Sequence, residues 1–152
     1  MIEIQQVNNE NYKVDHELII HAVEQVLKLH NKTNDDITIR LTDDKEIKEL
    51  NNLYRKINKT TDVLSFNQDI ENPETDRFYL GDIVISLEQT KKQANEQNNS
   101  FKKEYVLLAV HGTLHLLGFD HCNKEEKKRM WELQEKIIDD VFLNFQENHD
   151  KK

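Results

Sequence analysis

The order of the apolar segments is the feature that most constrains how this chain can fold. Strand-like and helix-like segments alternate at first, whereas the last third carries only helix-like periodicity. Ile83, Val84 and Ile85 form a continuous apolar run, which is typical of a central strand. The pattern predicts an α+β fold in which a small mixed sheet of about four strands packs with about five helices.

Four segments carry the signals of β-strands. They are residues 2–7, 37–41, 62–66 and 80–86, where apolar residues alternate with polar ones or run continuously. The last two segments are separated by a polar stretch that contains the only proline, Pro73. We expect that stretch to be a loop.

The predicted helical segments show apolar residues on one face. At the C-terminus, we expect the chain to fray from about His149. Three helix starts carry capping boxes, which pair a polar cap residue with a glutamate or glutamine three positions later. The predicted helices span 16–29, 43 to about 55, 86 to about 98, 101–117 and 123 onward, and the capping boxes are Asp43 with Glu46, Ser86 with Gln89, and Asn123 with Glu126.

Length and cysteine usage predict a single cytoplasmic domain covering residues 1–152. The first residues carry no apolar export signal, and Val106–Val110 is far too short to span a membrane. The one cysteine, Cys122, cannot form an intramolecular disulfide, which agrees with a reducing compartment. We therefore expect no membrane contact.

Three histidines in the C-terminal half have the spacing of metal ligands. His111 and His115 are four residues apart, so on a helix they project from one face. Gly118 predicts the end of that helix, after which the chain can turn back and bring in His121. Three neutral imidazoles with an open fourth position are typical of catalytic zinc, because structural zinc sites close all four positions. The motif predicts one Zn²⁺ with a water molecule as its fourth ligand, at the end of this helix.

A structural explanation of the same histidines remains open. His111 and His115 continue a stripe begun by Glu104, Leu107 and Leu108, where a lone histidine is more often a hydrogen-bonded core residue. That explanation does not account for three histidines at ligand spacing.

Residues beside the histidines carry weaker signals. Asp120 is a candidate to orient a ligand imidazole from behind, although capping or turn formation explains it equally well. Cys122 fits a spectator thiol better than a further ligand. Asp82 is a candidate for a role like that of Asp120, or it interrupts pairing at a strand edge. Ser65 is more readily explained as structural than as a phosphate donor.

Gly112 lies inside the predicted helix, where glycine costs about 1 kcal/mol relative to alanine. Either it leaves room for substrate beside the metal, or it packs tightly against a neighbouring element. Zinc proteases place their general-base glutamate at the corresponding position, directly after the first histidine. The glycine therefore argues against peptide hydrolysis by that mechanism.

The segment from His111 to His121 resembles the signature of the YbeY family of bacterial zinc-dependent endoribonucleases, and no position of the signature is missing. The resemblance extends to two further blocks and so covers most of the chain from about residue 46. Phe119 departs from the signature only in replacing a commoner tyrosine with another aromatic. The further blocks are Leu50, Asn51, Tyr54 and Arg55 with residues 61–66, and residues 80–86.

The resemblance implies a single-strand-specific endoribonuclease that acts in maturation of the 3′ end of small-subunit ribosomal RNA and in ribosome quality control. It implies His111, His115 and His121 as zinc ligands and Arg55 as the functionally important arginine. A guanidinium beside zinc can stabilise the charge that builds on a phosphodiester during cleavage. The alternative for Arg55 is a cation that favours the end of its own helix.

The net charge of −8 argues against binding of nucleic acid by bulk electrostatics. Lysine pairs at 91–92 and 102–103, with Lys56 and Lys59 near Arg55, are either a local basic track or solvated helix faces. We therefore expect targeting to ribosomal RNA by the small ribosomal subunit or by accessory ribosome-assembly proteins, and no DNA partner.

Two other functions are also compatible with these residues. One is a zinc hydrolase of a peptide or another small substrate, and the other is a non-catalytic ribosome-assembly factor with a structural metal. Cleavage assays on RNA and on casein distinguish the first of these functions from an endoribonuclease. The activity of Arg55→Ala distinguishes the second, because a non-catalytic factor would keep every activity in this variant.

Overall fold

The computed structural model describes residues 1–119 and 123–150, with the side chains of 145–150 excepted. In this part of the chain four strands form one sheet in the order β1-β2-β4-β3. β1, β2 and β4 are parallel to one another, and β3 is antiparallel to β4. This mixed sheet confirms the predicted α+β class. The strands are β1 (Ile2–Gln6), β2 (Asp35–Thr42), β3 (Val63–Asn72) and β4 (Arg77–Ser86).

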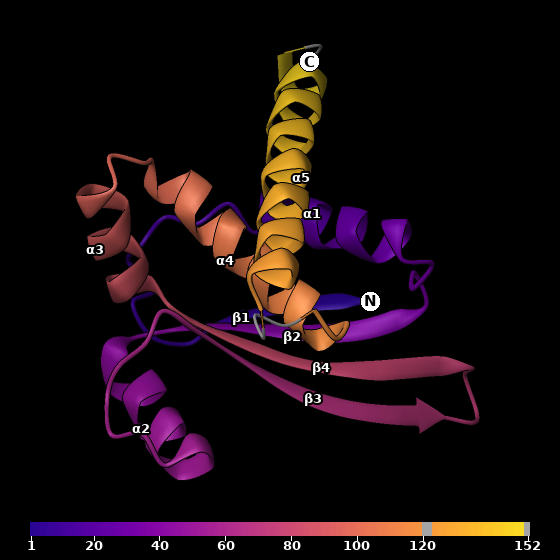
Figure 1. Ribbon diagram of the computed structural model, residues 1–152, viewed down its shortest axis with the longest axis horizontal. Coiled ribbons are helices and arrows are strands. Elements are labelled where there is room, and N and C mark those ends of the chain that lie inside the picture. The colour runs from indigo at the N-terminus through magenta and orange to yellow at the C-terminus, as the bar shows by residue number, and fades with distance from the viewer. Residues whose placement is uncertain (120–122, 151–152) are drawn as a thin grey trace.

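Five helices are present in the described part of the chain, as predicted. The predicted caps are formed: the side chains of Asp43, Ser86 and Asn123 each accept a hydrogen bond from the backbone N–H three residues later. Figure 1 shows α1, α4 and α5 on one face of the sheet and α2 on the other. The helices are α1 (His16–Leu29), α2 (Asp44–Arg55), α3 (Leu87–Glu96), α4 (Phe101–Leu116) and α5 (Lys124–Asp150).

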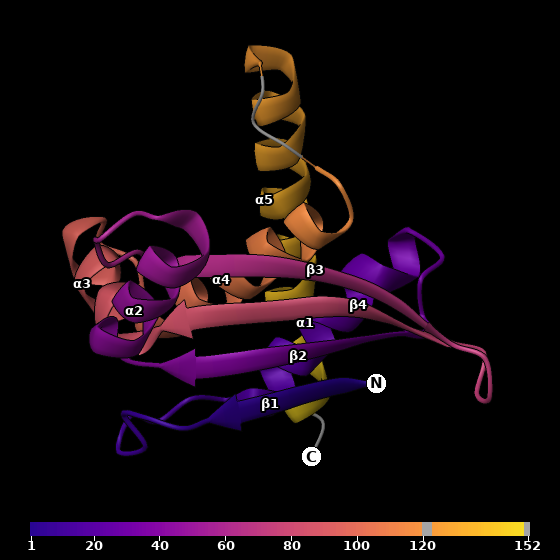
Figure 2. The same ribbon diagram turned by 90° about the horizontal axis from the view of Figure 1, so that it is seen from below.

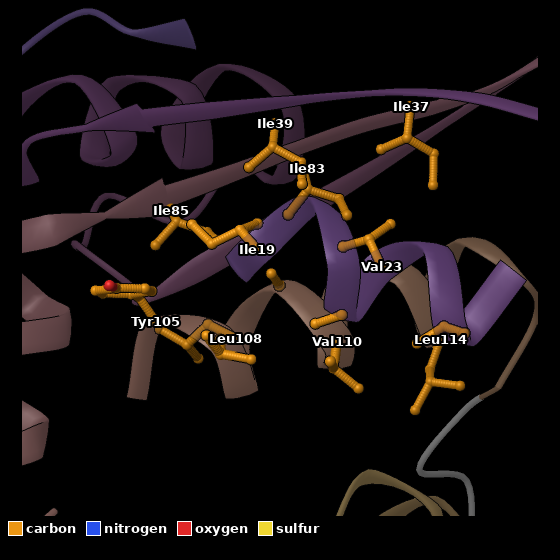
Figure 3. Close-up of a cluster of buried hydrophobic side chains, with 14 of the residues drawn as sticks. Ile19, Val23, Ile37, Ile39, Ile83, Ile85, Tyr105, Leu108, Val110 and Leu114 are labelled. Atoms are coloured by element: carbon orange, nitrogen blue, oxygen red, sulfur yellow. The ribbon is translucent and has the colours of Figure 1, made fainter. Parts of the chain in front are cut away.

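The core lies between the sheet and the helices α1, α4 and α5. β4 is central, as its continuous apolar run predicts, and Ile83 and Ile85 are fully buried on the face covered by α4. Figure 3 shows these side chains meeting those of α1, β2 and α4. Among residues 1–119 and 123–150, no helix is long and apolar enough to cross a membrane.

The polar stretch around Pro73 connects the two strands as predicted, but the connection is only a turn at residues 73–76 and is much shorter than the predicted loop. β3 and β4 continue their antiparallel pairing through it as far as Asn72 and Arg77, with a register shift between Asn67 and Ile70. Figure 2 shows this hairpin extending past the ends of the other strands. Both faces of the extension are largely exposed, so its residues lack the apolar alternation by which strands are recognised. Backbone pairing across a short turn holds it instead.

The C-terminal helix, α5, extends as far as Asp150, and residues 151–152 lie outside the described part. The fraying expected from about His149 stays a prediction. The apolar stripe of α5 packs against α1 and α4, where Met130, Ile137 and Val141 are buried as predicted. This packing brings the first half of α5 beside the predicted metal helix.

Candidate metal centre

His111 and His115 lie one turn apart on α4, and their rings converge. The ring centroids are 4.5 Å apart, and the two Nε2 atoms are 2.9 Å apart. Two nitrogens bound to one tetrahedral zinc at about 2.0–2.1 Å would be about 3.3 Å apart. The pair therefore fits two ligand positions of one zinc ion after a small separation of the rings. Both side chains are half-buried, so the pair is reached from one side.

The predicted third ligand, His121, lies outside the described residues, as do Asp120 and Cys122. Within the ranges 1–119 and 123–150, no three His, Cys, Asp or Glu side chains are grouped to hold a metal. The zinc site therefore stays a prediction that the histidine pair fits.

Gly118 ends the histidine-bearing helix α4 as predicted. Its φ of +99° is in the left-handed region that glycine adopts without strain. The backbone N–H groups of Gly118 and Phe119 donate to the carbonyls of His115 and Leu114, both at 3.0 Å. These bonds satisfy carbonyl groups of the last turn and close the C-terminus of α4.

Gly112 is explained by packing, the second of its two interpretations. A Cβ atom at this position would lie 2.8 Å from Cγ2 of Ile83 and 3.2 Å from Oγ of Ser65. The Ser65 hydroxyl donates to the Gly112 carbonyl at 3.1 Å, as expected for a structural serine. The position that a side chain would occupy at Gly112 thus faces the sheet. Because glycine has no side chain, α4 can approach β3 and β4 closely. A glutamate would have no room here.

Arg55 is the last residue of α2 and lies against β3. Its Nη2 donates to the carbonyl of Ser65 at 2.8 Å, and its guanidinium carbon is 5.7 Å from the ring centroid of Phe66. Ser65 in turn donates to Gly112, which stands directly after His111. Two hydrogen bonds therefore connect Arg55 with the histidine helix through Ser65. The hydrogen bond from Arg55 to Ser65 uses Nη2 of the guanidinium.

The structure adds Gln134, which the sequence interpretation missed. This α5 side chain is 2% exposed, and its Oε1 is 2.6 Å from Nδ1 of His111. The signal in the sequence is a polar residue on an otherwise apolar stripe, four positions after Met130 and three before Ile137. Its partner could not be read from the sequence, because it depends on how α5 packs on α4.

Asp82 lies away from the histidines, and neither of its two interpretations holds. Its neighbours Gly81 and Ile83 face α4, so Asp82 faces the other side of the sheet. There it accepts hydrogen bonds from the Tyr79 hydroxyl and from Nε2 of Gln68. Asp82 also belongs to the central strand β4 and is paired with both β2 and β3, so it does not lie at an edge of the sheet.

A hollow of about 840 Å³ lies on this second face, beside α2. Its lining includes Tyr79 and Asp82 of β4, Phe66 of β3 and Tyr54 of α2. Burial and the hydrogen bond to Asp82 raise the pKa of Tyr79 to about 12, so the phenol stays protonated at neutral pH. This hollow is therefore separated from the histidine pair by the sheet.

Lys102 and Lys103 do not lie beside the histidines. Lys102 and Lys103 lie in the first turn of α4, and nine residues of helix, about 13 Å, separate Lys102 from His111. Lys91 lies with its Nζ 5.3 Å from the ring centroid of Tyr12. The basic residues that follow Arg55 in the chain are Lys56 and Lys59.

Fold and site together define a class: small α+β proteins in which a helix packed on a mixed sheet presents a converging histidine pair. The family model described as endoribonuclease YbeY matches residues 2–141. The chain belongs to the YbeY family.

Relatives and a solved structure agree with this assignment. An endoribonuclease YbeY of Persephonella marina is 44% identical over 125 residues, which cover 82% of each chain. One of Caldanaerobacter subterraneus subsp. tengcongensis is 38% identical over 152 residues, with 90% of this chain and 96% of the relative covered. The solution structure of a Thermotoga maritima protein is similar with a TM-score of 0.66 and 27% identity, and covers 100% of this chain and 96% of that one.

Proposed function

We propose that this protein is a zinc-dependent endoribonuclease that cleaves single-stranded RNA. The observation that carries the proposal is the convergence of the His111 and His115 Nε2 atoms at 2.9 Å, in a chain whose relatives are named endoribonucleases. Two convergent imidazoles on one helix are a ready pair of ligands for a divalent metal. His121 is the third ligand in this proposal, and Asp120 supports a ligand ring.

When bound, zinc supplies a Lewis acid and lowers the pKa of a coordinated water toward ~7. The chain's own residues hold and orient this centre. The packing of Gly112 against Ile83 fixes the distance of α4 from the sheet, and Gly118 ends the helix directly after the histidine pair. Half-burial of the two rings leaves one side for the substrate.

In this proposal, Arg55 acts as a catalytic residue. Its hydrogen bond to Ser65 uses one of five N–H donors, and the contact with Phe66 holds the guanidinium plane near β3. The remaining donors suit the non-bridging oxygens of a phosphodiester, where negative charge builds during cleavage. The link from Arg55 through Ser65 to Gly112 supports a position close to the histidine helix.

The proposed substrate is ribosomal RNA, at the 3′ end of the small-subunit RNA, with a further role in ribosome quality control in the cytoplasm. The net charge of −8 predicts weak, salt-sensitive binding of naked RNA. We therefore propose that the small ribosomal subunit or accessory assembly proteins bring the enzyme to its target. Nanomolar binding to naked RNA at physiological salt would contradict this targeting.

The test compares wild-type protein with Arg55→Ala and His115→Ala on single-stranded RNA and on casein, with metal content measured in parallel. We expect RNA cleavage only, bound zinc in wild type and Arg55→Ala, and loss of zinc in His115→Ala. Arg55→Ala should fold normally and lose about 100- to 1000-fold in cleavage rate. Arg129→Ala is the matched control, because Arg129 is 77% exposed and its ion pair with Glu125 is a long one of 4.0 Å.

Other results would identify the competing functions. Cleavage of casein alone would support a peptide hydrolase, a function that Gly112 disfavours because a glutamate at 112 would collide with Ile83. Full activity in Arg55→Ala together with unfolding of His115→Ala would support a non-catalytic assembly factor with a structural metal. If Arg55→Ala and Arg129→Ala lost the same cleavage activity, the effect of Arg55→Ala would be explained by the change in net charge alone.

A further inference from the structure

Gln134 is a buried polar side chain in the apolar stripe of α5. It is 2% exposed and shares the buried side of the helix with Met130, Ile137, Ile138 and Val141. A buried amide is retained at such a place only when hydrogen-bond partners compensate for its loss of water. Its partner here is the imidazole of His111, across the contact between α4 and α5.

The contact defines which nitrogen of His111 carries the proton. Oε1 of Gln134 lies 2.6 Å from Nδ1 of His111, and an amide oxygen can only accept. The Nδ1–H of His111 therefore donates to Gln134, and Nε2 keeps its lone pair. That same Nε2 is the atom that faces Nε2 of His115 at 2.9 Å. The tautomer that Gln134 selects is the one in which His111 can bind a metal through Nε2.

We propose that Gln134 is a positioning residue that holds His111 in the Nδ1–H tautomer and in the ring orientation that presents Nε2 to zinc. The zinc part of this inference rests on the proposed function. Ligand histidines usually donate their second N–H to a carboxylate, a carbonyl or water, and such partners tune metal affinity. A neutral amide does this without placing a charge between α4 and α5. Because Gln134 is buried, it acts through His111 and not on RNA.

The experiment measures Zn²⁺ affinity by competition with a chromophoric chelator, in the full-length protein without RNA. Gln134→Met keeps the side-chain size but removes the acceptor, and we expect about 10- to 100-fold weaker Zn²⁺ binding. Gln134→Glu restores an acceptor and should bind Zn²⁺ at least as tightly as wild type. Ile138→Val is the control for altered packing, since Ile138 is buried on the same side of α5 and changes no polar group.

Two spectroscopic readouts separate positioning from a general loss of structure. In zinc-free protein labelled with ¹⁵N-histidine, the His111 signal, assigned by its loss in His111→Ala, should show the Nδ1–H tautomer in wild type and not in Gln134→Met. The visible spectrum of the Co²⁺-loaded protein should change in Gln134→Met and be restored in Gln134→Glu. Circular dichroism identifies any variant that fails to fold.

The possible results distinguish this inference from the proposed function. If wild type binds no Zn²⁺, both are overturned. If wild type binds Zn²⁺ and Gln134→Met binds it equally well, the positioning role alone is overturned. The same holds if Gln134→Glu fails to restore affinity, if Ile138→Val weakens Zn²⁺ binding as much as Gln134→Met, or if His111 shows the Nε2–H tautomer in zinc-free wild type.

Discussion

The two faces of the sheet are covered very differently. α1, α4 and α5 pack over one face, and α4 buries residues along its whole length, from Glu104 to Leu116. The other face is covered in part by α2, which buries only Ile47 and Asn51 and leaves the hollow of about 840 Å³. His111 and His115 belong to the closely packed face, whereas Arg55 lies at the exposed end of the sparsely packed helix α2.

The two parts of the proposed site therefore differ in how well they tolerate substitutions. A ligand pair needs fixed geometry, and close packing around α4 provides it, because packed interiors do not deform continuously. A guanidinium that meets a phosphate needs exposure and several unused donors instead. Substitutions on the α4 face should therefore act on stability, and substitutions at the end of α2 should act on activity.

The largest effect on stability is expected for Gly81→Ala. A Cβ at position 81 would lie 2.2 Å from the carbonyl oxygen of Phe66 and 2.9 Å from Cδ2 of Leu116. Backbone cannot yield as a flexible side chain does, so β3 or α4 must shift away from β4. We expect destabilisation by about 3 kcal/mol or more, measured by urea denaturation.

Gly118→Ala is the matched control for that substitution. Among the described residues, no atom other than those of its chain neighbours lies within 4 Å of a Cβ at this position, so its φ of +99° is the main obstacle to alanine. We expect a loss of about 1–2 kcal/mol. A Gly81→Ala protein no less stable than Gly118→Ala would show that the close packing of the α4 face is overstated.

Gly112→Ala should destabilise by about 1 kcal/mol. The clash with Ile83 at 2.8 Å costs about 1–3 kcal/mol, and the better helix propensity of alanine offsets about 1 kcal/mol of it. The double variant with Ile83→Ala should be more stable than the sum of the two single effects predicts, because the clash is then relieved. If Gly112→Ala instead stabilises the protein, position 112 has room, and the substrate-access interpretation returns.

Much of the fold was predictable because its signals are local. The capping residues Asp43, Ser86 and Asn123, the apolar run of β4 and the helix stop at Gly118 each act through neighbours in the sequence. The spacing of His111 and His115 likewise predicts their convergence, since one turn of helix alone brings them together.

What could not be predicted depends on contacts between distant segments. The hairpin beyond Asn67 is held by backbone pairing and carries no apolar pattern. The face occupied by Asp82 follows from the strand register, and the partner of Gln134 follows from the angle at which α5 crosses α4. The role of Gly112 was left as two alternatives, because only the packing distance to Ile83 decides between them.

Two glutamates should respond to pH in opposite directions, one on each face. Burial raises the pKa of Glu104 on α4, against the opposing hydrogen bond from Asn99. Its ionisation therefore opposes folding, and the penalty grows as the pH rises above the ordinary value of 4.5. Glu104→Gln should raise Tm at pH 7 by about 2–4 °C, the change expected for about 1 kcal/mol in a chain of this size. The gain should shrink toward zero below pH 4.5.

Glu46 on α2 is the counterpart. Its hydrogen bonds with the Arg40 guanidinium, one of them 2.9 Å long, lower its pKa below the ordinary value. Its ionised form favours folding above pH 4.5, and that contribution is lost as the pH falls through the lowered pKa. Glu46→Gln should therefore lower Tm slightly at pH 7, because the pair is partly exposed to solvent, and have no effect at low pH. Thermal scans between pH 3 and pH 8 test both signs, and a shift of the same sign in both variants would contradict the contrast.

The smallest effect on stability is expected for Arg55→Ala, the variant with the largest expected effect on activity. Its guanidinium is exposed, and its contacts are one hydrogen bond to Ser65 and the approach to Phe66. Exposed contacts of these kinds contribute about 0.5–1 kcal/mol each at most, and water replaces much of the hydrogen bond. We expect a loss below about 1 kcal/mol by urea denaturation, close to that of Arg129→Ala. A loss above about 2 kcal/mol would mean that Arg55 holds α2 against β3, so that reduced cleavage by this variant would no longer identify a catalytic guanidinium.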